Sequence, residues 1–226
     1  MDLVAGYESS SEEEDNEAKQ TFYHGQTQVI PYVEGRFPSF IYLECEMSPQ
    51  IKDVIEKSIQ IINSNLNSNF TIFPSDFHVS LSKLFTLIPS EIDLMVSKVR
   101  DSLKNMKRIQ LTFQNIDLLS NELHTRAFLV YLLSFSSAND VSSFVKSIDQ
   151  LMATFQKDLY YDPAIHHLSF ASQEFDGNQA SLFGAWKESF LSDDIQMNLA
   201  QVPLLNISVS KVCLKIGNRA YSFTLP

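Results

Sequence analysis

Two hydrophobic periods run along the chain from about residue 39, one typical of strands and one typical of helices. Runs of β-branched and aromatic residues predict strands, and apolar residues three or four apart predict helices. Each half of the chain has the order strand, helix, strand, helix, strand, which predicts an α+β fold with a weak internal duplication. The expected strands are 39–46, the extended run 70–83 with a turn at 74–76, 109–119, 127–135, the run through 167–171, 204–216 and 219–225. The expected helices are 48–66, 89–103, 140–156 and a short one through 186–190.

A short string marks the duplication, because it occurs once in each half. His78-Val79-Ser80 and His167-Leu168-Ser169 each place a histidine and a serine two positions apart on an expected strand. Side chains alternate between the two faces of a strand, so the histidine and the serine project from one face and the apolar residue points into the core. We therefore expect two imidazoles and two hydroxyls to meet in one cleft.

A pair of histidines suits the cleavage of a phosphodiester. With an unperturbed pKa of about 6.5, one imidazole can accept a proton while the other donates one near neutral pH. The serines are placed to bind phosphate oxygens, and they are less attractive as nucleophiles because no acidic partner stands at a triad spacing. Since single His-x-Ser strings and structural histidines are common, the pattern alone leaves a catalytic cleft and a structural role about equally open.

Composition and charge indicate how the chain is divided into tail and domain, and which cofactors and partners it is expected to have. The net charge is −10 over 226 residues, and seven acidic residues fall within the first 19, so the rest of the chain is closer to neutral. We expect residues 1–30 to form an acidic disordered tail and residues 31–226 to form the folded domain. Cys45 and Cys213 stand far apart, which predicts neither a disulfide framework nor a zinc cluster, and no cofactor is expected. With no apolar run near 18 residues and no signal peptide, we expect a soluble cytosolic or nuclear protein with no membrane partner. We also expect a monomer, although the sequence carries no signal for the oligomeric state.

The motifs and their surroundings resemble a known family. The two His-x-Ser strings look like the paired signatures of the two-histidine (2H) phosphoesterase superfamily, and within it the chain is similar to the Usb/Mpn family, which trims U6 small nuclear RNA. This narrower similarity rests on four features: the acidic start with Tyr7-Glu8-Ser9-Ser10-Ser11, the string His78-Val79-Ser80-Leu81-Ser82, the segment Tyr161-Asp162-Pro163, and the run from Lys211 to Asn218.

The resemblance implies two pseudo-symmetric lobes around a central cleft, each an antiparallel sheet with helices. It implies a metal-independent 3′-to-5′ exonuclease that acts in the nucleus on the single-stranded, uridine-rich 3′ end of U6 small nuclear RNA. The 2′-hydroxyl of the penultimate nucleotide would attack the last phosphodiester and leave a 2′,3′-cyclic phosphate, which some members open further.

The resemblance also assigns roles to residues. His78 and His167 would form the acid and base pair, Ser80 and Ser169 would bind the phosphate, and Tyr161 would stack on a base. Which histidine is the acid stays open, as does the choice between Tyr160 and Tyr161. By strand alternation His166 points away from the site, so we expect it to be structural or at the rim.

Two other functional classes use the same fold. One is a 2′,3′-cyclic phosphodiesterase of the tRNA-splicing or nucleotide type, and the other is a non-catalytic nucleotide-binding module. The intact motifs argue against the module, and the acidic start with the Tyr-Asp-Pro segment favours RNA trimming. Lys83 and a basic cluster around Lys98–Arg108 are possible RNA contacts or ordinary solvated charges, and His24 and His124 have no expected role.

Overall fold

The computed structural model describes residues 22–23, 26–27, 33–75, 77–121, 125–175 and 180–226. Within the expected tail, β1 (Phe22–Tyr23) pairs antiparallel with β2 (Gln26–Thr27). The division into a tail of residues 1–30 and a domain of residues 31–226 stays a prediction. The residues Tyr7 to Ser11, His24 and His124 lie outside the described part of the chain.

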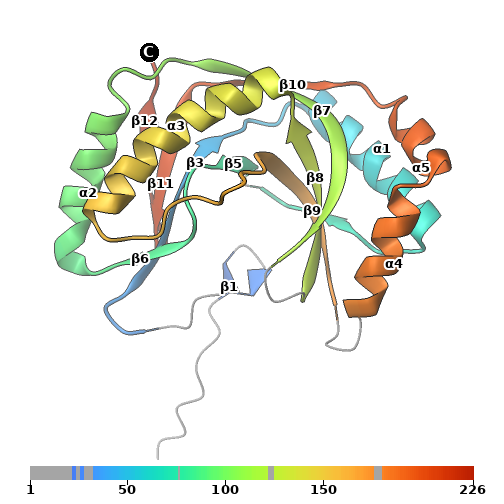
Figure 1. The fold of residues 1–226 in the computed structure, drawn as a ribbon, viewed down its shortest axis with the longest axis horizontal. Coiled ribbons are helices and arrows are strands. Elements are labelled where there is room, and N and C mark those ends of the chain that lie inside the picture. The colour runs from blue at the N-terminus through green and yellow to red at the C-terminus, as the bar shows by residue number, and fades with distance from the viewer. Residues whose placement is uncertain (1–21, 24–25, 28–32, 76, 122–124, 176–179) are drawn as a thin grey trace, which may run out of the picture.

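One curled antiparallel sheet forms the centre of the protein (Figure 1). Its strand order is β10-β7-β8-β9-β5-β3-β11-β12, with β4 beside β9 and β6 beside β3. The strands are β3 (Phe37–Glu44), β4 (Thr71–Ile72), β5 (His78–Ser80), β6 (Phe85–Leu87), β7 (Ile109–Ser120), β8 (Arg126–Leu133), β9 (His167–Glu174), β10 (Leu205–Val209), β11 (Lys211–Ile216) and β12 (Arg219–Thr224).

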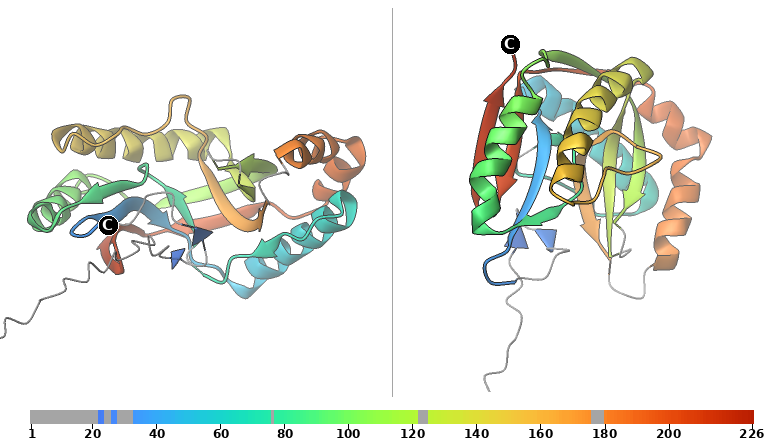
Figure 2. Two further views of the ribbon diagram at one scale, coloured as in Figure 1. Left: turned by 90° about the horizontal axis from the view of Figure 1, so that it is seen from below. Right: turned by 60° about the vertical axis from the view of Figure 1, so that its left-hand side comes forward.

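Two groups of helices pack against this sheet. Figures 1 and 2 show α2 and α3 side by side on one flank, and α1, α4 and α5 together on the other. The helices are α1 (Pro49–Leu66), α2 (Pro89–Ser102), α3 (Phe135–Thr154), α4 (Ala180–Phe190) and α5 (Asp193–Leu199).

The two halves of the chain have matching element orders. The first half runs β3, α1, β5, α2, β7 and the second half runs β8, α3, β9, α4, β11, with β4, β6, α5, β10 and β12 in addition. The last strand of each series pairs with the first strand of the other, because β7 pairs with β8 and β11 pairs with β3. The main path of the sheet thus has two halves of four strands, β5-β3-β11-β12 and β9-β8-β7-β10, which meet where β5 pairs with β9; β6 joins the first half at β3, and β4 joins the second at β9. This arrangement confirms the predicted α+β fold.

One expected strand is wrong. The run 204–216 forms two strands on opposite halves of the sheet, since β10 pairs with β7 whereas β11 pairs with β3 and β12. The break falls at Ser210. The burial pattern changes phase there: the buried positions in β10 have odd numbers, and Val212, Leu214 and Ile216 have even numbers. This change of phase is visible in the sequence and was the signal for the break.

The expected bounds of the third helix also differ from those observed. α3 begins at Phe135, five residues before the expected start, and the expected strand 127–135 ends at Leu133. The Ser134 hydroxyl accepts a hydrogen bond from the backbone N–H of Ser137, which is the usual role of a serine at a helix start. Phe135 suggested a strand because it is aromatic, but its side chain is 81% exposed on the first turn. The helix α5 and the short strand β6 were not expected.

The contact between the two half-sheets lies in the middle of the core. Val79 of β5 is the register partner of Leu168 of β9, and both side chains are fully buried. On the same buried face, Tyr131 is the partner of Leu168, and its hydroxyl lies 2.9 Å from the Ser58 hydroxyl of α1. Burial of these residues therefore joins the half-sheets to each other and to a helix.

Truncation of the junction should cost substantial stability. We expect Leu168→Ala to lower the free energy of unfolding by about 2–5 kcal/mol, because the cavity would lie where the half-sheets meet. The matched control is Leu94→Ala on α2, where the side chain is 54% exposed and the expected loss is below about 0.5 kcal/mol. Chemical denaturation measures both. Equal losses in the two variants would contradict the importance given to the junction.

Candidate active site

The junction of the half-sheets brings the two His-x-Ser motifs together. Because β5 and β9 run antiparallel with Val79 opposite Leu168, His78 stands opposite Ser169 and Ser80 stands opposite His167. The four side chains project from the face opposite the buried pair, and each is half-buried. The structure thus brings all four expected residues to one face.

The register also fixes how the four groups are arranged. Residues directly opposite in an antiparallel pair have Cβ atoms about 5 Å apart, and diagonal neighbours are about 7–8 Å apart. Each histidine therefore has the serine of the other motif beside it, and the two imidazoles are diagonal neighbours. This spacing leaves room for one tetrahedral phosphate between two proton-transferring groups, with a hydroxyl near each.

A pocket of about 690 Å³ opens on this face. One wall comes from the segment that links α3 to β9, another from the ends of β7 and β8, and a third from the residues that follow β5. The lining residues are Lys83, Leu84, Leu119, Ser120, Asn121, Phe128, Asp158, Tyr160, Tyr161, Pro163, Ile165, His167 and Ser169. The apolar walls at Leu84, Leu119, Phe128 and Ile165 were not predicted, because their sequence pattern does not distinguish them from core residues.

His167 is held in one tautomer by the backbone. Its Nδ1 lies 2.7 Å from the Ile165 carbonyl oxygen, which can only accept, so Nδ1 carries the hydrogen and Nε2 is left to exchange protons. Burial lowers the pKa of His167 from its ordinary value, and the hydrogen bond to Ile165 acts in the opposite direction with a smaller effect. A lowered pKa favours the neutral imidazole near pH 7.

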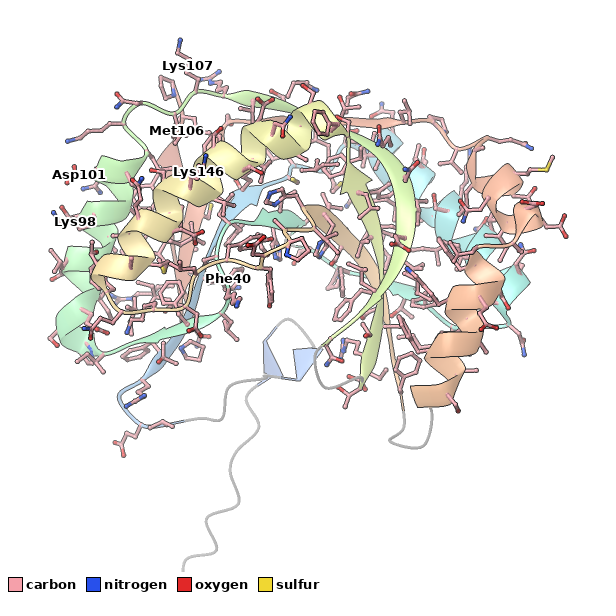
Figure 3. The ribbon with its side chains drawn as sticks, in the orientation of Figure 1. Phe40, Lys98, Asp101, Met106, Lys107 and Lys146 are labelled. Carbon is pink, nitrogen blue, oxygen red and sulfur yellow. The ribbon has the colours of Figure 1, made fainter. Side chains whose placement is uncertain are left out.

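His78 lies among aromatic rings on the same face of the sheet. Its ring centroid is 5.0 Å from that of Tyr42 and 5.5 Å from that of Phe40. Tyr42 is the register partner of Ser80, so these rings extend the site across β3. Figure 3 shows Phe40 inside the curved sheet, whereas Lys98 and Lys107 of the basic cluster lie outside it. The sequence signal for Phe40 and Tyr42 was their alternation with buried Ile41 and Leu43.

The structure distinguishes the two neighbouring tyrosines. Tyr161 is 49% exposed and lines the pocket, and the Lys83 ammonium lies 4.7 Å from its ring centroid. Tyr160 is buried, and its backbone N–H donates to Asp149 of α3 at 2.9 Å. The two rings meet edge to face at 5.4 Å. Tyr161 therefore presents the accessible ring, and the buried Tyr160 ring packs against its inner side.

His166 lies in the core and not in the pocket. Its side chain is 7% exposed, its Nε2 lies 3.0 Å from the Ser142 hydroxyl of α3, and its ring stacks on Tyr160 at 5.5 Å. Burial and the neighbouring His167 lower the pKa of His166. Its position agrees with the alternation along β9, which directs His166 and His167 to opposite sides.

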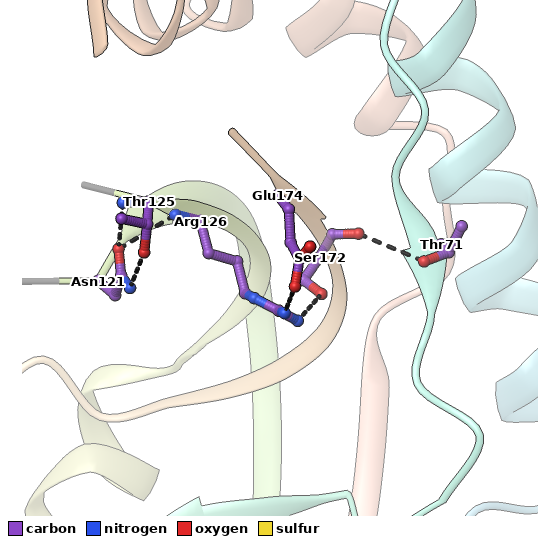
Figure 4. Close-up of polar contacts among 6 residues, drawn as sticks. All are labelled: Thr71, Asn121, Thr125, Arg126, Ser172 and Glu174. Atoms are coloured by element: carbon purple, nitrogen blue, oxygen red, sulfur yellow. Dashed lines mark hydrogen bonds and ion pairs between the residues drawn. The ribbon is translucent and has the colours of Figure 1, made fainter. Parts of the chain in front are cut away.

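A polar network braces the far end of the pocket (Figure 4). The Asn121 side-chain oxygen accepts from the backbone N–H groups of Thr125 and Arg126, at 2.9 and 3.1 Å. The buried Arg126 side chain donates to the Ser172 hydroxyl at 3.2 Å and forms an ion pair with Glu174. These contacts tie the ends of β7 and β8 to β9, so the wall that contains Asn121 and Phe128 has a fixed position.

Within the described ranges, no three His, Cys, Asp or Glu side chains gather closely enough to hold a metal ion. No helix in the part of the chain that the structure describes combines the length and apolar character needed to span a membrane.

Comparison with solved structures identifies the fold. Kluyveromyces marxianus Usb1 is similar with a TM-score of 0.68 over 83% of this chain and 98% of that chain, at 14% identity. The structure titled Kluyveromyces marxianus Usb1 with uridine monophosphate gives a TM-score of 0.66 at 15% identity, with the same coverage. At this level of identity the similarity shows the fold alone, and it agrees with the predicted arrangement of helices and sheet around a cleft.

Comparison with known sequences identifies the family. The U6 snRNA phosphodiesterase 1 of Mus musculus is 24% identical over 99% of this chain and 82% of its own length. The protein of the same name from Dictyostelium discoideum is 26% identical over 65% of this chain, and the match spans only 54% of that relative. The HVSL family model, described as an uncharacterised conserved protein, matches residues 3–224, and the chain contains those four letters at His78-Val79-Ser80-Leu81. These matches confirm the resemblance seen in the sequence, and the chain belongs to the HVSL family.

Proposed function

We propose that this protein is a metal-independent 3′-to-5′ exoribonuclease that trims uridines from the 3′ end of U6 small nuclear RNA. The observation that carries the proposal is the placement of His78, His167, Ser80 and Ser169 on one face at the junction of β5 and β9. The relatives named U6 snRNA phosphodiesterase 1 support the choice of substrate. This substrate places the protein in the nucleus, and we propose that it acts there as a monomer.

The arrangement suits one transesterification. The 2′-hydroxyl of the penultimate nucleotide attacks the last phosphorus atom while one imidazole removes the hydroxyl proton. The bond from phosphorus to the 5′-oxygen of the terminal nucleoside breaks, and the other imidazole gives that oxygen a proton. The Ser80 and Ser169 hydroxyls donate hydrogen bonds to the non-bridging oxygens, where negative charge increases in the transition state. The products are a nucleoside and an RNA shortened by one residue, with a 2′,3′-cyclic phosphate.

The pocket has the features needed to hold a terminal base. Tyr161 presents an exposed ring on one wall, and stacking of a base on an aromatic side chain is worth about 1–3 kcal/mol. Lys83 stands over the same ring and would attract the phosphate backbone. The apolar residues Leu84 and Ile165 give the base a dry environment beside the reacting phosphate.

The substrate test uses short RNAs that end in oligouridine, incubated with the protein in EDTA. We expect the RNA to lose uridines one at a time, because the two histidines supply both proton transfers without a metal ion. An RNA with a 2′-deoxy penultimate nucleotide should not be cleaved, because it lacks the attacking hydroxyl. Gel electrophoresis with mass spectrometry of the ends measures both results. Cleavage of the deoxy RNA, or a requirement for added metal, would contradict the mechanism.

The histidine test compares the two proposed catalytic residues, His78 and His167, with the buried His166. We expect His78→Ala and His167→Ala each to lower kcat by about 10²- to 10⁴-fold, because each removes one proton-transferring group. His166→Ala is the control, and it should change kcat little in the folded protein because His166 contacts Ser142 and lies outside the pocket. Circular dichroism establishes folding. A loss of kcat in His166→Ala as large as in His167→Ala would mean that the wrong imidazole was chosen.

The tyrosine test distinguishes Tyr161, proposed to stack on the terminal base, from Tyr160, which packs against Tyr161. Tyr161→Ala should raise KM for oligouridine roughly 5- to 150-fold, which corresponds to a loss of about 1–3 kcal/mol of stacking, whereas Tyr161→Phe should keep the affinity. The matched variant is Tyr160→Phe, which keeps the buried ring and should leave KM unchanged. Steady-state kinetics on one RNA measure all three. If Tyr161→Ala bound RNA normally, Tyr161 would not be the base platform.

A further inference from the structure

The strands that flank the two motifs break the symmetry of the site. His78 has Glu44 of β3 as its register partner, whereas His167 has Leu132 of β8 in the corresponding position. Partners in an antiparallel pair project from the same face with Cβ atoms about 5 Å apart. One imidazole therefore has a carboxylate beside it, and the other has a hydrocarbon side chain.

Glu44 belongs to a charged cluster that is negative overall. Lys211 of β11 places its ammonium 3.0 Å from the Glu44 carboxylate and 2.9 Å from that of Glu46. The two carboxylates raise the pKa of Lys211, so it stays charged. Two negative charges share one positive charge, which leaves the three residues with a net charge of −1. These three residues line a second pocket, of about 310 Å³, together with Lys52 of α1. Lys52 is exposed, so water screens its charge.

The aromatic rings beside His78 favour a cation as well. The ring centroids of Phe40 and Tyr42 lie within 5.5 Å of the imidazole, in the range where an aromatic ring attracts a positive charge. Cys213 of β11 is the register partner of Tyr42, and burial raises the pKa of its thiol, so it adds no charge. The titratable groups on this face of the neighbouring strands are Tyr42 and Glu44 of β3, Lys211, Cys213 and Lys215 of β11, and His167 of β9; Lys215 is the register partner of Phe40, one strand further from His78 than Glu44.

The surroundings of His167 favour the neutral form. Leu132 and partial burial remove water from the ring, and burial lowers its pKa. The Lys83 ammonium lines the same pocket and disfavours a second cation there. Asp158 lines the same pocket and has the opposite charge to Lys83. The Ile165 carbonyl favours a charged His167 with a smaller effect than burial, and it also fixes Nε2 as the nitrogen that accepts a proton.

We propose that Glu44 is a positioning residue that keeps His78 protonated in the resting enzyme, so that His78 is the proton donor and His167 the acceptor. This assignment rests on the proposed function. The 2′-hydroxyl proton passes to Nε2 of His167 as the new bond to phosphorus forms. The bond to the 5′-oxygen breaks, and that oxygen receives the proton of His78. Exchange with water then restores both histidines to their starting states.

The test is a titration of the free protein followed by NMR of the histidine ring Cε1–H signals. Loss of single signals in His78→Gln and His167→Gln assigns them. We expect His78 to titrate at a higher pH than His167 in the unmodified protein. Glu44→Gln should lower the pKa of His78 by about 0.5 to 1 pH unit and leave that of His167 in place, because one nearby opposite charge is lost and Lys211 remains. Glu56→Gln, an equal change of charge at an exposed site on α1, should move neither.

The kinetic counterpart is the pH dependence of kcat/KM. With His167 as the acceptor, activity should fall on the acidic side at a pH below about 6.5, because the lowered pKa of His167 keeps it neutral to that point. Glu44→Gln should move only the basic limb, toward lower pH. The proposal is overturned if His78 titrates at or below His167, or if Glu44→Gln leaves the titration of His78 unchanged. Since the titration needs no substrate, inactivity toward oligouridine would count against the proposed function alone.

Discussion

The pairing of Val79 with Leu168 is the constraint on which the candidate active site depends. These two buried side chains fix the register of β5 against β9, and that register determines which motif residues stand opposite each other on the other face. A slip of one residue would turn every histidine and serine of one motif into the core. The geometry of the chemistry is therefore set by hydrophobic burial on the opposite side of the sheet, and the exchange of β7 and β11 between half-sheets holds that junction from both sides.

The two half-sheets are nearly symmetric, whereas the proposed reaction needs one histidine as proton donor and the other as proton acceptor. Two identical imidazole environments would leave the proton on either side with equal probability, and only one arrangement is productive at a time. In this chain the difference comes from the flanking strands, which carry Glu44 beside His78 and Leu132 beside His167. The pocket adds a second asymmetry, because Tyr161, Lys83 and the apolar walls gather on the side of His167. We propose that these two asymmetries together determine which histidine donates the proton and on which side the terminal base binds.

The sequence predicted the parts of the structure that depend on local patterns. The alternation around His78 and His167 was enough to place four residues on one face, and to separate His166 from His167. It did not divide the run 204–216, although the alternation changes phase at Ser210, because β10 and β11 follow each other directly and the partners that separate them lie far away in the chain. The same reason explains why the sequence did not predict the pocket walls at Leu119 and Phe128 or the neighbours of His78. Strand pairing between distant segments decides which apolar residues face the site. The role proposed for Glu44 could not be predicted from the sequence, because it depends on the register that places Glu44 opposite His78 of β5.

The central claim is that both motifs act on one phosphate at the junction of β5 and β9. The most direct measurement is a crystal structure of the protein with an oligouridine whose penultimate 2′-hydroxyl is replaced by fluorine, so that the substrate binds but cannot react. We predict that the last phosphate lies between the imidazoles of His78 and His167, within hydrogen-bond distance of the Ser80 and Ser169 hydroxyls. A phosphate held by one motif only, or bound elsewhere on the sheet, would contradict this account.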